Sequence, residues 1–179
     1  MDTIRLVTET LLRLLKTEIA TDAVLVAADD VFEATRVPAL LLQGPLLIED
    51  APRRTLASWA ACDRDAMTFV GGRYPRLYHL DFDLVVSTGT ERDLLTLTGK
   101  LAFLYQRFPV LAVEGIGSLP LTELTPLGGM RRVNLSNLRQ ASGRCRIEDC
   151  PVGDDATLAT GEGHLVGTPR IEVNLGGEA

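Results

Sequence analysis

The sequence predicts an α+β protein, with a mixed, mostly antiparallel sheet packed against an N-terminal helix and a central helix. Residues 77–87 alternate apolar and polar side chains, the period of a strand with one buried face. Residues 91–108 place leucines and aromatics at spacings of three and four, the period of an amphipathic helix. This helix can cover the apolar face of the strand, which carries Tyr78, Leu80, Phe82, Leu84 and Val86.

The first 50 residues add one helix and two strands to this prediction. Residues 3–19 carry an apolar stripe at helical spacing. The short apolar runs 23–28 and 38–43 are typical of buried strands, and Pro38 stands at the first position of the second run, where a strand tolerates proline. Residues 46–48 continue this second strand beyond a kink at Gly44-Pro45.

The chain that follows the central strand is equally patterned. Thr90 and Asp93 have the spacing of a capping box at the start of the central helix. Residues 109–113 and 119–125 then read as short strands, and 126–130, with two glycines and a proline, as a turn-rich loop.

Residues 133–138 suggest a short helical turn, and 140–150 alternate as a strand with one charged face. On such a strand the odd separation of Cys145 and Cys150 places the two thiols on opposite faces.

We expect a single domain over residues 1–150, with an insertion at about 50–73. Residues 55–73 have no clear period and form either a mobile insertion or a hairpin. Residues 151–179 make a glycine-rich extension with one short alternating run, at 170–175, that can form a strand.

Composition excludes several classes of protein. With 179 residues and 46% hydrophobic content the chain can bury a core, and its net charge of −6 argues against binding nucleic acid through phosphates. Three cysteines without an export signal predict a reducing compartment rather than a disulfide framework. No apolar run reaches the roughly 18 residues of a membrane span, so we expect no membrane partner.

One strand face places His79, Asp81 and Asp83 together, and these types can bind a metal ion. A solvated face, or one that lines an aqueous lumen, is the more common meaning of this pattern, and no second cluster of His or Glu has matching spacing. The glycine pairs lack the order of phosphate-binding loops, and no serine has the context of a nucleophile. We therefore predict no catalytic residue, no metal site and no cofactor.

The late part of the chain holds the one basic concentration, which consists of Arg131, Arg132, Arg139, Arg144 and Arg146. These arginines either form a solvated strand face or make a subunit contact with Asp81, Asp83 or Glu91 of a neighbouring copy.

The order of these parts resembles the tail-terminator, or tail-completion, family of long-tailed bacteriophages, and more distantly the cap proteins of contractile injection particles. The resemblance covers about residues 1–150 and is carried by five elements. They are the N-terminal helix, the proline-led strand 37–42, the alternating strand 78–86, the helix 91–108 that ends in Phe-Pro-Val, and the late strand 140–150.

This resemblance implies a structural virion protein rather than an enzyme. Members of the family form hexameric rings that cap the tail tube and join it to the head connector or stopper. It implies that DNA passes through the lumen without specific binding, with His79, Asp81 and Asp83 facing that lumen, and that the five arginines and Glu91 lie in subunit contacts. The protein would be found in the virion tail or neck, and in the host cytoplasm during assembly.

Two alternatives remain open from the sequence. One is an adaptor or another head–tail connector protein that binds a protein ligand. The other is a small metal-dependent enzyme that uses His79, Asp81 and Asp83.

Overall fold

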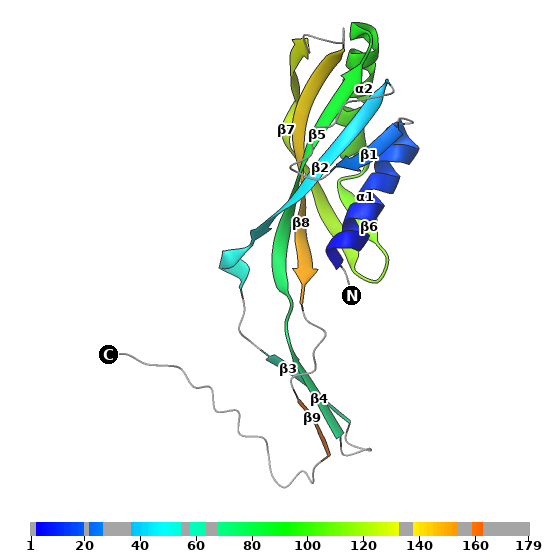
Figure 1. The fold of residues 1–179 in the computed structure, drawn as a ribbon. Helices are drawn as coiled ribbons and strands as arrows, with labels where there is room; N and C mark the ends of the chain where they lie inside the picture. The colour runs from blue at the N-terminus through cyan, green and yellow to red at the C-terminus, as the bar shows by residue number, and fades with distance from the viewer. Residues whose placement is uncertain are drawn as a thin grey trace, which may run out of the picture. The chain divides into compact units, whose positions relative to one another are not determined.

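The computed structural model describes residues 3–19, 22–26, 37–54, 58–63, 68–132, 138–153 and 159–162. The chain divides into two compact units (Figure 1). Unit 1 comprises Met1–Thr55 with Pro75–Gly153, and unit 2 comprises Leu56–Tyr74 with Asp154–Ala179.

Unit 1 is a two-layer α/β arrangement with one six-stranded sheet, in the order β1-β2-β5-β8-β7-β6. Only β1 and β2 are parallel; every other neighbouring pair is antiparallel, which confirms the predicted fold class. The elements are α1 (Thr3–Ile19), β1 (Asp22–Val26), β2 (Ala39–Glu49), the short 3-10 helix η1 (Ala51–Arg53), β5 (Arg76–Thr88), α2 (Glu91–Arg107), β6 (Val110–Val113), β7 (Gly117–Arg132) and β8 (Arg139–Val152).

The two helices lie on the same side of this sheet (Figure 1). α1 packs against β1, β6 and β8, and α2 packs against β5, β7 and β8. The leucines of α2 at spacings of three and four are buried, as is the apolar face of β5 from Leu80 to Val86. The α2 leucines are Leu94, Leu97, Leu101 and Leu104. The helix-covered face of the sheet is therefore the core, and the other face, here called the open face, is left uncovered by α1 and α2.

Thr90 is the N-cap of α2, as its spacing to Asp93 predicts. The Asp93 backbone N–H donates to Thr90 Oγ1 at 3.1 Å, and the Thr90 hydroxyl donates to the Asp93 carboxylate at 2.7 Å. The Asp93 side chain thus bonds the cap hydroxyl rather than the cap backbone, so this is a variant of the predicted capping box.

A β-bulge divides β2 in two at Gly44-Pro45. Two residues of β2 stand opposite one of β5 here, because the register steps from Gln43 to Leu46. Gly44 has a φ of +118°, and a Cβ at this position would lie 2.9 Å from the Asp81 carbonyl oxygen. Only glycine fits such a close approach without strain.

A second irregularity corrects the prediction for the two cysteines. Cys145 and Cys150 are both buried in the core, not on opposite faces. Ile147 of β8 stands opposite Leu80 of β5, and Cys150 stands opposite Tyr78, so β8 has one more residue than β5 between these two pairs. Asp149, within this bulge, adopts a φ of +59°. The extra residue resets the alternation, so both thiols point to the same side.

Residues 126–130, predicted as a loop, belong to β7, so that prediction is wrong. β7 continues to Arg132 through three register shifts against β8. Leu127 packs against the core, and a Cβ at Gly143 would lie 2.8 Å from the Thr125 carbonyl oxygen and 3.1 Å from Leu127 N. The absence of a side chain at Gly143 therefore gives β7 space to bulge toward β8. The two strands remain paired on both sides of this bulge.

Unit 2 contains a three-stranded antiparallel sheet, in the order β3-β4-β9. Its strands are β3 (Ser58–Asp63), β4 (Thr68–Arg73) and β9 (Ala159–Glu162). β3 and β4 pair as a hairpin, one of the two alternatives that the sequence left for this stretch. The helical turn suggested near 133–138 and the strand suggested at 170–175 fall almost entirely outside the described residues.

Candidate functional site

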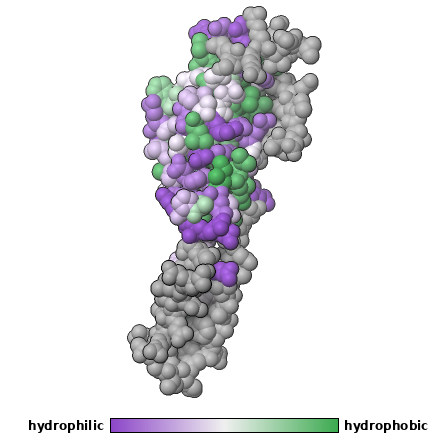
Figure 2. All heavy atoms as spheres, turned by 90° about the vertical axis from the view of Figure 1, so that its left-hand side faces the viewer, coloured by the Kyte–Doolittle hydropathy of each residue, from purple (hydrophilic) through white to green (hydrophobic). Residues whose placement is uncertain are grey.

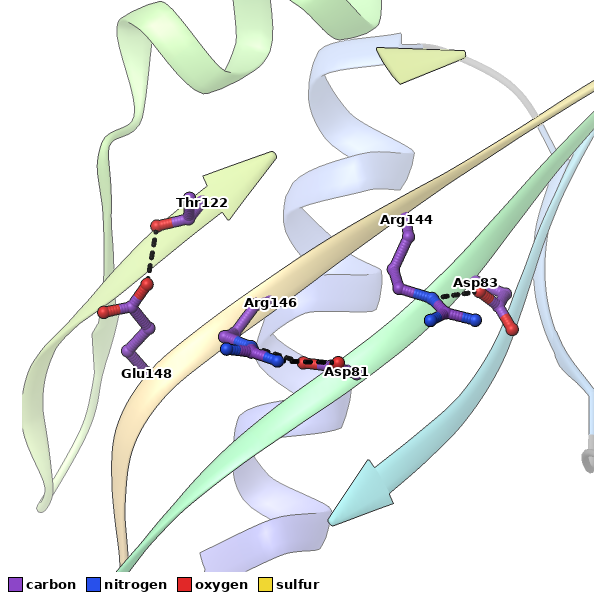
Figure 3. A network of polar contacts seen from close by, with 6 residues as sticks. All are labelled: Asp81, Asp83, Thr122, Arg144, Arg146 and Glu148. Atoms are coloured by element: carbon purple, nitrogen blue, oxygen red, sulfur yellow. Dashed lines mark hydrogen bonds and ion pairs between the residues drawn. The ribbon is translucent and has the colours of Figure 1, made fainter. Parts of the chain in front are cut away.

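The open face of the sheet carries a ladder of opposite charges between β5 and β8 (Figure 3). Asp81 stands directly opposite Arg146, and Asp83 directly opposite Arg144. Arg146 donates from Nε and Nη2 to the two carboxylate oxygens of Asp81, at 2.6 and 3.0 Å. Arg144 donates from Nε to Asp83 at 2.7 Å. Cross-strand pairs of opposite charge stabilise such a sheet and help to set its register.

Asp81 departs from the solvated face that the alternation predicts, whereas the side chain of Asp83 is about half exposed. Asp81 is only 5% exposed, and Arg146 engages both of its oxygens. The hydrogen bond to Asp81 raises the pKa of Arg146, and the hydrogen bond to Asp83 raises the pKa of Arg144, so both guanidinium groups stay charged. The four residues of the ladder are therefore neutral as a set.

The ladder borders an open hollow of about 510 Å³. Four strands contribute to it, through Gln43, Asp83, Val85, Thr125, Ser142, Gly143 and Arg144. Next to the ladder, the Thr122 hydroxyl donates to Glu148 at 3.1 Å (Figure 3). The lining includes the Arg144–Asp83 ion pair, whose two side chains are about half exposed.

His79 lies on the same strand and is half-buried. Its Nδ1 is buried without a hydrogen-bond partner. His79 does not join Asp81 and Asp83 in a metal site: within the described part of the chain, no three His, Cys, Asp or Glu side chains are grouped to hold a metal ion. The metal-dependent alternative therefore has no geometry to support it there.

The remaining predicted site residues lie near the N-terminal end of β8, where β7 ends and α2 begins. Arg139 donates to Glu91, at the start of α2, at 2.7 Å. Arg131 and Arg132 stand opposite Gln140 and Arg139 in the β7–β8 register. The three acidic residues that the sequence offered for a subunit contact each pair with an arginine of their own chain: Glu91 with Arg139, Asp83 with Arg144, and Asp81 with Arg146.

Sequence reasoning missed two groups of exposed apolar side chains. Leu46, Leu47 and Ile48 follow the β2 bulge, and Leu95 and Phe103 lie on α2 outside its buried stripe. The signal was present: an unbroken apolar triplet after Pro45, and two large apolar residues out of phase with the helix core. Figure 2 shows the side of the molecule that faces left in Figure 1, away from α1. The described surface on this side is mainly hydrophilic, with a few apolar groups.

None of the described helices is long and apolar enough to cross a membrane.

No known protein family matches the sequence, and no characterised protein is similar enough in sequence to be matched. Among solved structures, the fold is similar to that of a PVC sheath/tube terminator of an extracellular contractile injection system, determined in its extended state by cryo-electron microscopy. The TM-score is 0.59 at 14% identity, over 96% of this chain and 64% of that one. This chain therefore spans somewhat less than two thirds of that protein, and the two share a fold.

Proposed function

We propose that the protein is a tail terminator, a structural component that caps the end of a tail-like tube and stops its growth. The observation that carries this proposal is the shared fold with a sheath/tube terminator over 96% of the chain. The order of elements along the sequence, which resembles the terminator family, supports it independently.

The surface of unit 1 is consistent with a part that works by contact. Its open face bears a neutral, internally paired ladder, and its exposed apolar residues gather in separate groups rather than lining one enclosed cavity. Rings form through heterologous contacts, which need two different patches on each subunit. We expect a hexameric ring, with the tube protein on one side and, in a phage, the head connector or stopper on the other.

Within this proposal, His79, Asp81 and Asp83 face the lumen. Because both aspartates are paired with arginines, the lining is neutral at those positions rather than repulsive to DNA. Arg131, Arg132, Arg139 and Glu91 lie at or near subunit contacts, whereas Arg144 and Arg146 stay with Asp83 and Asp81 at the lumen.

The test is absolute mass in solution, measured by light scattering on a sizing column over a concentration series, with and without purified tail tubes. A hexamer, or a monomer that forms rings at tube ends in electron micrographs, is the expected result. A chain that stays monomeric or dimeric and ignores tubes overturns the proposal, and a discrete dimer that binds another protein favours an adaptor.

A further inference from the structure

The hollow beside the ladder gathers hydrogen-bonding side chains that the chain itself does not use. Elsewhere on the open face such groups bond one another, as where Gln140 donates to the Ser87 hydroxyl at 2.9 Å. Around the hollow, by contrast, the side chains of Gln43, Thr125 and Ser142 form no hydrogen bond with any other described residue. Their donors and acceptors are therefore available to another molecule.

The ion pair of the hollow also has bonding capacity left. Arg144 donates to Asp83 Oδ1 through Nε alone, at 2.7 Å (Figure 3). Among the described residues, no hydrogen bond engages either Nη of Arg144 or Oδ2 of Asp83. Arg146 differs, because it engages both carboxylate oxygens of Asp81. The hollow thus presents a charged donor next to a charged acceptor.

The centre of the hollow is held by regular pairing, and its two sides are irregular. The β2 register shifts between Gln43 and Leu46, and the β7 register shifts between Thr125 and Gly128. β5 and β8 lie between these two strands and stay in register around the ion pair. The charged groups are therefore positioned before any ligand arrives, which lowers the cost of binding.

The charges of this site favour a neutral ligand. An anion that approaches the Arg144 guanidinium also meets the Asp83 carboxylate, and a cation meets the reverse. A carboxamide carries N–H donors and a carbonyl acceptor on one planar group. Its carbonyl can accept from Arg144 Nη while its N–H donates to Asp83 Oδ2, and hydrogen bonds to charged groups are the stronger kind.

The form of the hollow indicates what kind of molecule presents the carboxamide. Sites for small molecules usually enclose most of the ligand and are lined mainly by apolar side chains. This hollow is open, and its described lining has one large apolar side chain, Val85, and no aromatic ring on which a sugar could stack. A side chain presented by another protein needs no such enclosure, because its own chain holds it in place.

We propose that the hollow binds the side-chain carboxamide of an asparagine or glutamine on an uncharged polar segment of a partner protein. The site belongs to a single chain, so this inference goes beyond the proposed function and does not depend on ring formation. Within the proposed ring, the partner is a protein that reaches the lumen, where Asp83 and Arg144 lie.

Saturation-transfer difference NMR on the full chain tests the ligand chemistry. The probes are tripeptides blocked at both ends, acetyl-Ala-X-Ala-amide, in which X is Gln, Glu, Lys or Leu. We expect the Gln peptide to bind with a Kd of about 1 mM, about fivefold or more tighter than the other three, and equally at low and high salt. Equal binding of all four, a preference for Glu or Lys, or binding of methyl glucoside in place of the Gln peptide overturns the proposal.

Two variants test which residues make the site. Asp83→Asn removes the carboxylate and leaves Arg144 uncompensated, so the preference switches to the Glu peptide by about tenfold and becomes salt-dependent. Gln43→Leu combined with Thr125→Val weakens binding of the Gln peptide about tenfold at an unchanged Tm, because neither side chain has a described partner to lose. Ser118→Ala, at an exposed position of β7 outside the hollow, is the matched control and binds as the wild type does.

The outcomes separate this inference from the terminator function. A chain that forms rings on tail tubes but binds none of the peptides overturns the carboxamide site alone. A chain that binds the Gln peptide but stays monomeric and ignores tubes overturns the terminator function alone. An Asp83→Asn variant that keeps the wild-type preference for the Gln peptide overturns the role of the ion pair in selecting the ligand, and with it the proposed site.

Discussion

Arg146 holds Asp81 through two hydrogen bonds, 2.6 and 3.0 Å long, although 65 residues separate them in the chain. The pair joins the two central strands of the sheet, β5 and β8, at a point where the Asp81 side chain is 5% exposed and that of Arg146 is 25% exposed. It therefore lies at the boundary between the core and the open face, where an unpaired charge is costly.

Replacing Asp81 with Asn should destabilise the protein markedly, because it leaves the partly buried Arg146 guanidinium without its hydrogen-bonded counter-charge. Loss of one partner from a fully buried pair costs about 3–5 kcal/mol, and the partial exposure of Arg146 reduces our expectation to about 2 kcal/mol. Denaturant unfolding, monitored by circular dichroism, gives the free energy of unfolding.

Asp83→Asn is the matched control for that measurement. It breaks the neighbouring ion pair between Asp83 and Arg144. Both side chains are about half exposed, so solvent and salt already screen the attraction that is lost. We expect a clearly smaller effect that fades at high ionic strength. Equal losses from the two substitutions would show that burial does not govern the ladder.

Gly143→Ala should be strongly destabilising. The new methyl group would lie 2.8 Å from the Thr125 carbonyl oxygen, a backbone atom that cannot move without opening the β7–β8 pairing. Overpacking of this kind costs typically about 1–3 kcal/mol. Gly128→Ala, across the same strand pair, is the control: its nearest contact is 3.7 Å, so its melting temperature should remain near that of the wild type.

Thr90→Ala should destabilise α2 by about 1 kcal/mol, because the Asp93 N–H loses its acceptor at the start of the helix. Thr90→Ser retains the hydroxyl and should restore most of that loss. Thermal unfolding of the three proteins measures the difference. If Ser and Ala behaved alike, the hydroxyl would have no part in capping.

We expect the free energy of unfolding to fall at alkaline pH because the thiols of Cys145 and Cys150 are buried in the core. Burial raises the pKa of Cys145 to about 12 and that of Cys150 to about 11. In the unfolded chain thiols ionise near pH 8.5, so above that pH the unfolded state binds fewer protons than the native state. The contribution of these thiols to the free energy of unfolding is complete below about pH 8.5 and declines until the native thiols ionise.

Denaturant unfolding at a series of pH values from neutral to strongly alkaline checks this direction. A variant with Cys145→Val and Cys150→Val should lose less stability over the same range than the wild type does. The same burial predicts that both native thiols resist alkylation until the protein unfolds. Rapid labelling of Cys145 or Cys150 under native conditions would contradict the prediction.

The sequence by itself determined the helices, most strands, the buried face of β5 and the cap of α2. These features depend on local periodicity and on neighbours within one helical turn, as Leu80 to Val86 and Thr90 with Asp93 illustrate. The sequence also identified the charged residues of the open face, since alternation placed Asp81, Asp83, Arg144 and Arg146 away from the core.

Only the tertiary structure decided how those charges pair and where the alternation fails. The register between β5 and β8 brings together residues more than 60 positions apart, and local patterns carry no information on such distances. A bulge shifts every later side chain to the other face, so one extra residue at Asp149 is enough to bring Cys150 into the core, where Cys145 also lies. Likewise, Leu46 and Phe103 stand out from the local pattern in the sequence, but their exposure is decided by where the β1–β2 pairing ends and by which side of α2 meets the sheet.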